Sequence, residues 1–424
     1  MPVTINSIRL LEELHHLATF TDPPQSPPTT TSGIPDTPVT RIVFTDKDRE
    51  ARAWLSQLAT EAGLTVRHDA IGNTFFRWQG STPGEPAVAT GSHIDAIPNA
   101  GMYDGTVGVL GGLEAIRALK SSGFAPERSI ELILFTSEEP TRFGIGCLGS
   151  RLMSGTLCAE AAEKLRDPEG KSLDEARTAA GFTGSLDQVQ IDQDHYAAFV
   201  ELHIEQGPIL EREGESIGIV RAIAAPASAT ITINGLGGHA GALLMPDRRD
   251  ALTAAAEVIL AIESAARATG VADTVATVGT CDVFPGAVNS VASRVRLSLD
   301  VRDIDEARRN SVLASIRHAC NYIATERGVT ITNQPLNSDS PAICAPSVVG
   351  NIEEVCVETR TASRAMISRA YHDTLFMARI CPAGMIFIPC RAGVSHRPDE
   401  YATPESIAKG TEILAATLAA LSLS

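Results

Sequence analysis

The sequence predicts an α/β fold in which a mostly parallel sheet carries an inserted β-α-β-β-α-β (ferredoxin-like) domain. Short apolar runs alternate with helical patterns along most of the chain, which is typical of a parallel sheet covered on both faces. From about residue 216 to 336 the order of elements changes to β-α-β-β-α-β, a compact unit of its own. We therefore expect a first domain built from residues 1–216 and 336–424, interrupted by a second domain at 217–335.

The first elements follow from local patterns. Residues 5–20 repeat leucine and isoleucine at helical spacing, which predicts an amphipathic helix. The proline-rich stretch 22–40 should be an irregular loop, because proline removes a backbone donor and blocks helix. Thr45 is a suitable N-cap for a helix that runs to Ala62. Alternation over residues 64–80 predicts a hairpin.

The remaining elements of the first domain are buried strands and amphipathic helices. Strands are expected at 87–90, 129–136, 197–207 and 385–389, and helices at 106–123, 348–361 and 404–422. In the inserted domain, strands are expected at 228–235, 274–284, 293–303 and 329–334, with helices at 249–269 and 305–327. Its first strands alternate between apolar and polar residues, so one face of this second sheet should be exposed.

The composition excludes several classes of protein. A formal net charge of −16 argues against a nucleic-acid partner, because phosphates require clustered Lys and Arg. No apolar run reaches the roughly 18 residues that span a bilayer. Residues 1–20 lack a secretory signal, so a cytoplasmic protein is expected, and the ending SLS matches a peroxisomal address only poorly. The eight cysteines form no CxxC pair, which favours reduced thiols.

Polar side chains with metal-ligand chemistry occur where four predicted strands end. They are His93 with Asp95, Glu138 with Glu139, His203, and His396, and Asp104 follows on the first of these loops. Ligands of open α/β sheets bind outside the carboxyl ends of the strands, so we expect these residues to converge.

Three imidazoles with two or three carboxylates are too many ligands for one tetrahedral zinc ion. They suit two divalent ions bridged by a carboxylate, for which we select Asp104. His93 and His203 would complete one ion, and Glu139 and His396 the other. The oxygen-rich set favours Mn²⁺, with Zn²⁺ as the alternative.

Two acidic residues are left beside the expected ions. Asp95 lies two residues beyond His93 and is better placed to orient that imidazole than to bind metal. Glu138 is the natural general base for the attacking water.

Each feature alone has a plainer explanation. Adjacent glutamates are usually a solvated surface pair, His203 could be a buried core histidine, and His396 an ordinary loop residue. The conjunction at the end of one sheet favours a two-metal hydrolytic site.

These residues also resemble a known family, the dinuclear-metal amidohydrolases related to aminoacylases and carboxypeptidase-like metallopeptidases. The chain resembles most the branch that acts on carbamoyl and ureido groups, which includes allantoate amidohydrolases, N-carbamoyl-amino-acid hydrolases and ureidoglycolate amidohydrolases. The matching motifs are GSHIDAIPNAGMYDGTVGVLGGLEA, FTSEEPTRFGIGCLGS, ELHIEQGPILE, GGHAGALLMPDRRDAL, PGAVNSV, DVRD and YHDTLFMARICPAGMIFIPCRAGVSH.

The resemblance implies roles for further residues and for the inserted domain. His239 resembles a histidine that reaches across a homodimer to polarise the scissile carbonyl, and Asn289 and Arg302 resemble groups that hold a substrate carboxylate. Gln206 resembles a residue that contacts the ureido end. Residues 217–335 would then form a lid and dimerisation domain.

The substrate is also inferred from the resemblance. FTSEEPTRFG, SRAYHDTLFMAR and GMIFIPC resemble most the plant-type enzymes that act on (S)-ureidoglycolate in purine-ureide breakdown. Relatives acting on allantoate commonly show AGHDA where this chain has RAYHDT, which argues against allantoate as the substrate and leaves His372 as a substrate-side candidate. The alternatives are allantoate or an N-carbamoyl amino acid as substrate. More remotely, a binding protein on the same fold would lack a ligand or the base, and none is missing here.

Overall fold

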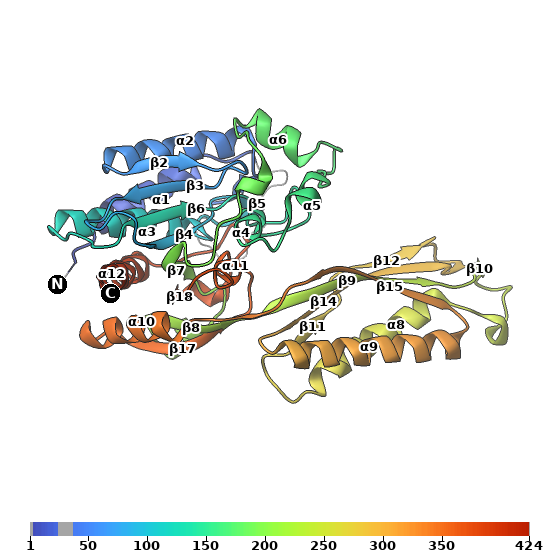
Figure 1. Cartoon of the computed structure of the whole chain (residues 1–424). Helices are drawn as coiled ribbons and strands as arrows, with labels where there is room; N and C mark the ends of the chain where they lie inside the picture. The colour runs from blue at the N-terminus through green and yellow to red at the C-terminus, as the bar shows by residue number, and fades with distance from the viewer. Residues whose placement is uncertain (1–2, 24–36, 424) are drawn as a thin grey trace. The chain divides into compact units, whose positions relative to one another are not determined.

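The computed structural model describes residues 3–23 and 37–423 and divides the chain into two compact units (Figure 1). The larger unit comprises Met1–Arg221 and Ile343–Ser424, and the smaller unit Ala222–Ala342. These boundaries replace the predicted ones at 216 and 336. The chain remains in the larger sheet for longer than predicted, because β8 (Ile217–Ile223) pairs with β18 (Ala383–Ile388) before the chain leaves that sheet.

The larger unit contains most of the helices and strands. Its other elements are α1 Ser7–Ala18, β1 Val39–Arg41, α2 Asp46–Glu61, β2 Thr65–His68, β3 Thr74–Trp78, β4 Ala87–Ser92, β5 Ala96–Ala100, α3 Thr106–Ser121, β6 Ile130–Leu134, α4 Leu148–Met153, α5 Ala159–Glu163, α6 Leu173–Ala179, η1 Leu186–Gln188, β7 Tyr196–Ile204, α7 Ile209–Glu213, β16 Ala342–Ile343, α10 Pro346–Glu358, β17 Ser363–Ser368, α11 Thr374–Met377, η3 Arg391–Gly393 and α12 Pro404–Leu421.

A nine-stranded mixed sheet forms the framework of this unit, in the order β16-β8-β18-β7-β4-β6-β3-β2, with β17 beside β8. The four central strands β18, β7, β4 and β6 run parallel to one another. The expectation of a mostly parallel sheet is therefore met only at the centre. Towards one edge, β2 and β3 form a hairpin through a short turn, and β3 pairs antiparallel with β6. On the other side of the parallel strands, β8 pairs antiparallel with β18.

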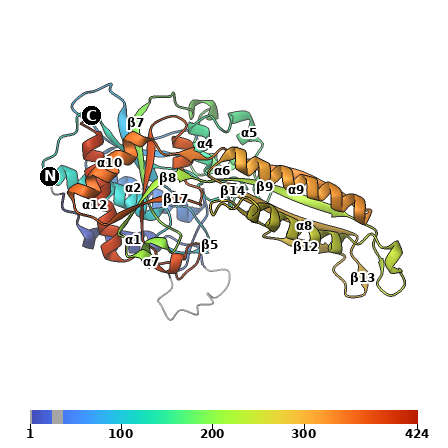
Figure 2. The same cartoon turned by 90° about the horizontal axis from the view of Figure 1, so that it is seen from below.

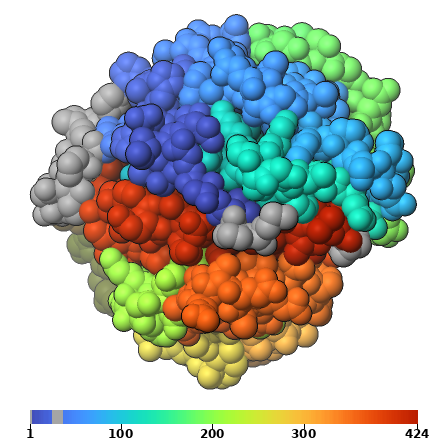
Figure 3. All heavy atoms as spheres, turned by 90° about the vertical axis from the view of Figure 1, so that its left-hand side faces the viewer, coloured from blue at the N-terminus to red at the C-terminus, as the bar shows by residue number. Residues whose placement is uncertain are grey.

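The central strands form because they are mostly apolar and buried on both faces. Every residue of β4, β6 and β18 is buried. Helices α3 and α12 pack on one face of the sheet, and α1 packs beside them, so that the two ends of the chain adjoin on this surface (Figure 3). The opposite face packs against Phe143, Leu148, Leu152 and Leu173, which come from the segment between β6 and β7.

Several local predictions are confirmed. The first helix is α1, the hairpin is β2–β3, and Thr45 caps α2 by accepting a hydrogen bond from the backbone of Asp48. Most of the proline-rich loop predicted at 22–40 lies outside the described residues, and its last residues form the short strand β1.

The smaller unit is a five-stranded antiparallel sheet with two long helices on one face (Figure 2). Its elements are β9 Ala225–Asn234, β10 Gly238–His239, η2 Met245–Asp247, α8 Ala251–Arg267, β11 Val275–Thr277, β12 Cys281–Phe284, β13 Ser290–Val291, β14 Arg294–Asp303, α9 Glu306–Arg327 and β15 Thr330–Ser338. The strand order is β11-β14-β9-β15, and β12 also pairs with β14. Burial alternates along β9 and β14, because only one face of the sheet is covered by α8 and α9.

Two further expectations concern the cysteines and membrane-spanning helices. All eight cysteines lie within the described ranges and are free thiols. Across the described part of the chain, no helix has the length and apolar character that crossing a membrane would require.

Close contact between β4 and β6 predicts that Gly91→Ala lowers the free energy of unfolding by roughly 1–3 kcal/mol. A Cβ at Gly91 would overlap the backbone carbonyl of Ile133 on β6, and neither strand can move freely inside a buried sheet. Urea unfolding measures the change. Gly350→Ala on α10 is the control, because a Cβ there meets open space and should be neutral or stabilising by up to about 1 kcal/mol. Equal losses in both variants would contradict the prediction.

Candidate metal centre

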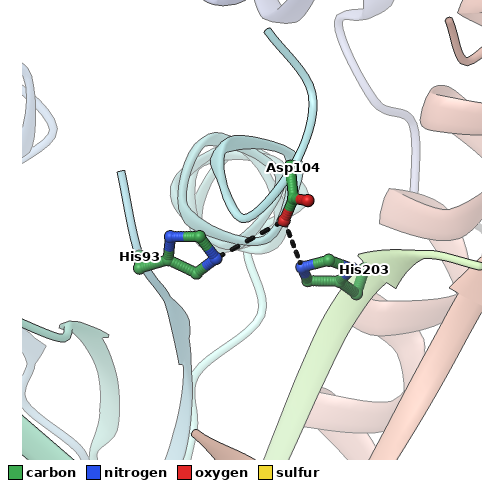
Figure 4. A group of neighbouring side chains, drawn as sticks. All are labelled: His93, Asp104 and His203. Carbon is green, nitrogen blue, oxygen red and sulfur yellow. Dashed lines mark ion pairs between the residues drawn. The ribbon is translucent and has the colours of Figure 1, made fainter. Parts of the chain in front are cut away.

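Two imidazoles point at one carboxylate oxygen beyond the ends of β4 and β7 (Figure 4). The Nε2 atoms of His93 and His203 lie 3.5 and 3.2 Å from Oδ1 of Asp104. His93 directly follows β4, His203 is close to the end of β7, and Asp104 lies in the loop before α3. All three side chains are buried.

A second group shares Asp104 through its other oxygen. Nε2 of His396 lies 3.3 Å from Oδ2 of Asp104 and 3.1 Å from Oε1 of Glu139. In each of the two groups, one donor atom per residue lies within 4.8 Å of the others. The five side chains selected from the sequence thus lie together, and the donor set fits two divalent ions that share one carboxylate. Their role as ligands stays a prediction.

Hydrogen bonds at Nδ1 hold the orientation of the His93 and His203 imidazoles. Nδ1 of His93 is 3.0 Å from the carbonyl oxygen of Asp95, and Nδ1 of His203 is 2.9 Å from that of Ile204. A protonated Nδ1 at these positions leaves Nε2 free to bind a metal ion. The Asp95 carboxylate lies 3.6 Å from Nδ1 of His93, and it also accepts hydrogen bonds from the backbone N–H groups of Glu138 and Glu139 at 3.2 and 3.0 Å. Its expected role in orienting His93 stays a prediction.

Hydrogen bonds within the cluster lower the pKa of Asp104 and raise the pKa of His396. Burial alone would raise the pKa of Asp104, but hydrogen bonds from His203, His396 and His93 hold it well below its usual range. The pKa of His396 is raised to about 11 by its hydrogen bonds with Asp104 and Glu139. Without metal ions, protons on the histidines therefore balance the central carboxylates.

Glu138 is a buried acid beside the cluster. Its Oε2 lies 3.7 Å from Nε2 of His93, and Cys147 Sγ is 3.4 Å from its Oε1. Burial raises the pKa of Glu138 well above its usual value, against the opposing effect of His93, and Glu139 raises it further. A carboxyl group whose pKa is raised in this way is suited to take up and return a proton near neutral pH.

Gln206 and His372 are also at the cluster. Nε2 of Gln206 donates to Oδ2 of Asp104 at 2.7 Å, while its own Oε1 is buried without a hydrogen bond. The ring of His372 stands edge-on to His203 with centroids 4.5 Å apart, and its Nε2 is 2.9 Å from Ser368 Oγ. Burial lowers the pKa of His372 well below its usual value, so this ring is neutral.

The remaining predicted residues belong to the smaller unit. His239 and Asn289 are neighbours there, because β10 pairs with β13 and the Ala240 N–H donates to the Asn289 carbonyl at 2.9 Å. Both side chains are exposed. Arg302 lies on β14, and its Nε donates to Asp300 at 2.8 Å.

Ser395 and Glu400 are among the residues at the cluster that were not selected from the sequence. Ser395 Oγ donates to Oδ2 of Asp104 at 2.7 Å, and Glu400 accepts the backbone N–H of Asp104 at 3.0 Å. Ser395 adjoins a selected histidine, which is a usable signal. Nothing in the sequence pattern identifies Glu400.

Comparison with known proteins relates the whole chain to one group of hydrolases. The family model described as peptidase family M20/M25/M40 matches residues 89–420. A ureidoglycolate hydrolase of Arabidopsis thaliana is 51% identical over 430 residues, which cover 99% of this chain and 88% of that protein. A ureidoglycolate hydrolase of Oryza sativa subsp. japonica is 50% identical over 427 residues, which cover 100% of this chain and 86% of that protein.

A solved structure is equally similar. The crystal structure of AtUAH in complex with (S)-hydroxyglycine has a TM-score of 0.88 and 50% sequence identity, and the match covers 100% of this chain and 99% of that one. The complex of AtUAH with glyoxylate matches with the same values.

The charge balance predicts that the metal-free protein releases protons when it binds Mn²⁺. His396 is protonated at neutral pH because its pKa is raised to about 11, and an imidazole must lose this proton before it can bind a metal ion. Mn²⁺ affinity should therefore rise over roughly pH 6 to 8, by about tenfold per pH unit for each proton released.

Calorimetric titrations in buffers of different ionisation enthalpy count these protons. His396→Ala is the matched variant and should release fewer protons than the unaltered chain. An affinity that does not change with pH would contradict this charge balance.

Proposed function

The chain belongs to peptidase family M20/M25/M40, and we propose that it hydrolyses the ureido C–N bond of (S)-ureidoglycolate. The observation that carries this proposal is the 51% identity to a ureidoglycolate hydrolase along 99% of the chain. The buried cluster around Asp104 supports it, because His93, Asp104, Glu139, His203 and His396 are all present with suitable donor atoms together.

The proposed reaction consumes water and forms glyoxylate, ammonia and carbon dioxide. Attack of water at the ureido carbon breaks its terminal C–N bond and releases ammonia and a carbamate. The carbamate then loses carbon dioxide as its remaining C–N bond breaks and the nitrogen takes up a proton, which leaves hydroxyglycine. Loss of a second ammonia from hydroxyglycine then gives glyoxylate. The two AtUAH complexes, one with (S)-hydroxyglycine and one with glyoxylate, are consistent with this order in a relative.

His93, Asp104 and His203 would hold one divalent ion, and Asp104, Glu139 and His396 a second. When bound, such ions act as Lewis acids and lower the pKa of a nearby water. The carboxylate oxygens favour Mn²⁺ over Zn²⁺.

The protein's own groups handle the proton and orient the substrate. Glu138 takes a proton from the attacking water and returns it to the departing nitrogen, which its raised pKa permits. Asp95 keeps Glu138 and Glu139 in place through their backbone N–H groups. Gln206 and the neutral His372 line the cluster on the substrate side.

The smaller unit would act as a lid and as the dimerisation domain of a homodimer. His239 Nδ1 accepts a hydrogen bond from the Gly241 N–H at 3.1 Å, so the ring's proton is on Nε2, where it can be donated to a substrate carbonyl. Asn289 and Arg302 would hold the substrate carboxylate, for which a guanidinium fork is well suited.

Ammonia release from the purified, Mn²⁺-loaded chain tests the proposed activity. We expect (S)-ureidoglycolate to be turned over faster than allantoate or N-carbamoyl amino acids. A preference for either alternative would overturn the substrate, and no turnover of any of them would favour a binding protein. Glu138→Gln should lower kcat by about 10²- to 10⁴-fold with bound metal retained. Unchanged hydrolysis by that variant would exclude the assigned base.

Arg302→Lys tests the proposed carboxylate site. Lysine keeps the charge but loses the bidentate fork, so KM for ureidoglycolate should rise by about tenfold or more while kcat changes little. Arg296→Lys is the control, because Arg296 lies on the same strand and is exposed. An unchanged KM in the Arg302 variant would remove this residue from the site.

A further inference from the structure

Glu400 is a buried carboxylate that binds the Asp104 loop from the far end of the chain. Its Oε1 accepts the backbone N–H groups of Tyr103 and Asp104 at 2.9 and 3.0 Å. Its Oε2 lies 2.9 Å from Ser395 Oγ. The residue is only 4% exposed, so these contacts are shielded from water.

Ser395 extends this contact to the carboxylate itself. Its Oγ donates to Oδ2 of Asp104 at 2.7 Å. Ser395 Oγ lies between the two carboxylates, and its single hydroxyl proton serves one of them at a time. Glu400 thus contacts the Asp104 backbone directly and the Asp104 side chain by way of Ser395. The two contacts limit both the position of the loop and the rotation of the carboxylate.

Packing leaves the Glu400 side chain a single position. A Cβ on Gly101 would overlap both the Cβ and Oε1 of Glu400. The loop therefore runs directly against the carboxylate. Any side chain at Gly101 would push Glu400 away from the two backbone N–H groups that donate hydrogen bonds to it.

The orientation of Asp104 matters because its two oxygens face different partners. Oδ1 faces His93 and His203, whereas Oδ2 faces His396. A modest rotation of the carboxylate would move both oxygens away from their partners at once. Neither donor group that shares Asp104 includes Glu400, so within the described residues it supports the cluster without belonging to it.

We propose that Glu400 is a positioning residue that, with Ser395, sets the orientation of the Asp104 carboxylate for metal binding. This inference rests on the proposed metal pair. Groups that hold a metal ligand in place commonly change metal affinity or activity by about 10- to 100-fold when they are removed. Glu400→Ala should weaken Mn²⁺ binding by about this factor.

Calorimetric Mn²⁺ titration and metal content after gel filtration are the measurements, with thermal unfolding recorded in parallel. Glu400→Gln should bind Mn²⁺ almost as tightly as the unaltered chain, because an amide oxygen still accepts the two N–H groups and its NH₂ can donate to Ser395. Rescue by glutamine but not alanine would identify the hydrogen bonds as the cause.

Glu114→Ala is the matched control. Glu114 is an equally buried carboxylate, but it binds Arg9 and the backbone of Asn6 instead of the Asp104 loop. Its removal should lower thermal stability and leave Mn²⁺ affinity unchanged. Equal loss of Mn²⁺ binding in both alanine variants would show a general effect of destabilisation and overturn the proposal.

Two further variants keep the proposal testable if Glu400→Ala does not fold. Gly101→Ala displaces the Glu400 side chain, and Ser395→Ala removes the hydroxyl that lies between Glu400 and Oδ2 of Asp104, so both should weaken Mn²⁺ binding. Wild-type affinity in these folded variants would overturn the inference alone. An unaltered chain that binds no Mn²⁺ would instead overturn the proposed metal pair.

Discussion

The carboxylate of Asp104 is the group on which the rest of the site depends. Three imidazoles, an amide and a hydroxyl all approach its two oxygens, and it is almost completely buried. A buried carboxylate is costly unless it is paired and hydrogen-bonded. The surrounding histidines meet that requirement as protonated partners without metal ions, and cations would replace their protons when metal binds.

The sheet explains how these groups reach one point. The four central strands are parallel, so their carboxyl ends lie at the same edge, and the loops that follow carry histidines and acids. Several of these loops use strained backbone. The backbone φ angles are 57° at Ser137, 54° at Gln206 and 58° at His396. Residues other than glycine seldom adopt this region. Such strain costs of order 1 kcal/mol or more per residue and is typical of functional sites.

The environment also gives chemically similar side chains different roles. Asp104 is kept ionised by its hydrogen bonds, whereas burial raises the pKa of Glu138. His396 is protonated without metal, while His372 is neutral because it is fully buried next to another imidazole. A carboxylate with a lowered pKa, a carboxyl group with a raised pKa and a neutral imidazole thus lie within one cluster, because local surroundings separate their pKa values.

The sequence by itself determined most of the long elements and which polar residues follow the central strands. Helix and strand patterns are set by neighbours along the chain, and the residues that follow strands could be placed at one sheet edge by topology alone, as for His93 and His203. Tertiary structure alone decided the antiparallel flanks of the sheet, the domain boundaries at 221 and 342, and the partner of Gln206. It also decided the position of Glu400, which meets Asp104 across 296 positions. Contacts of this kind depend on how packed loops meet in space, and no local periodicity encodes them.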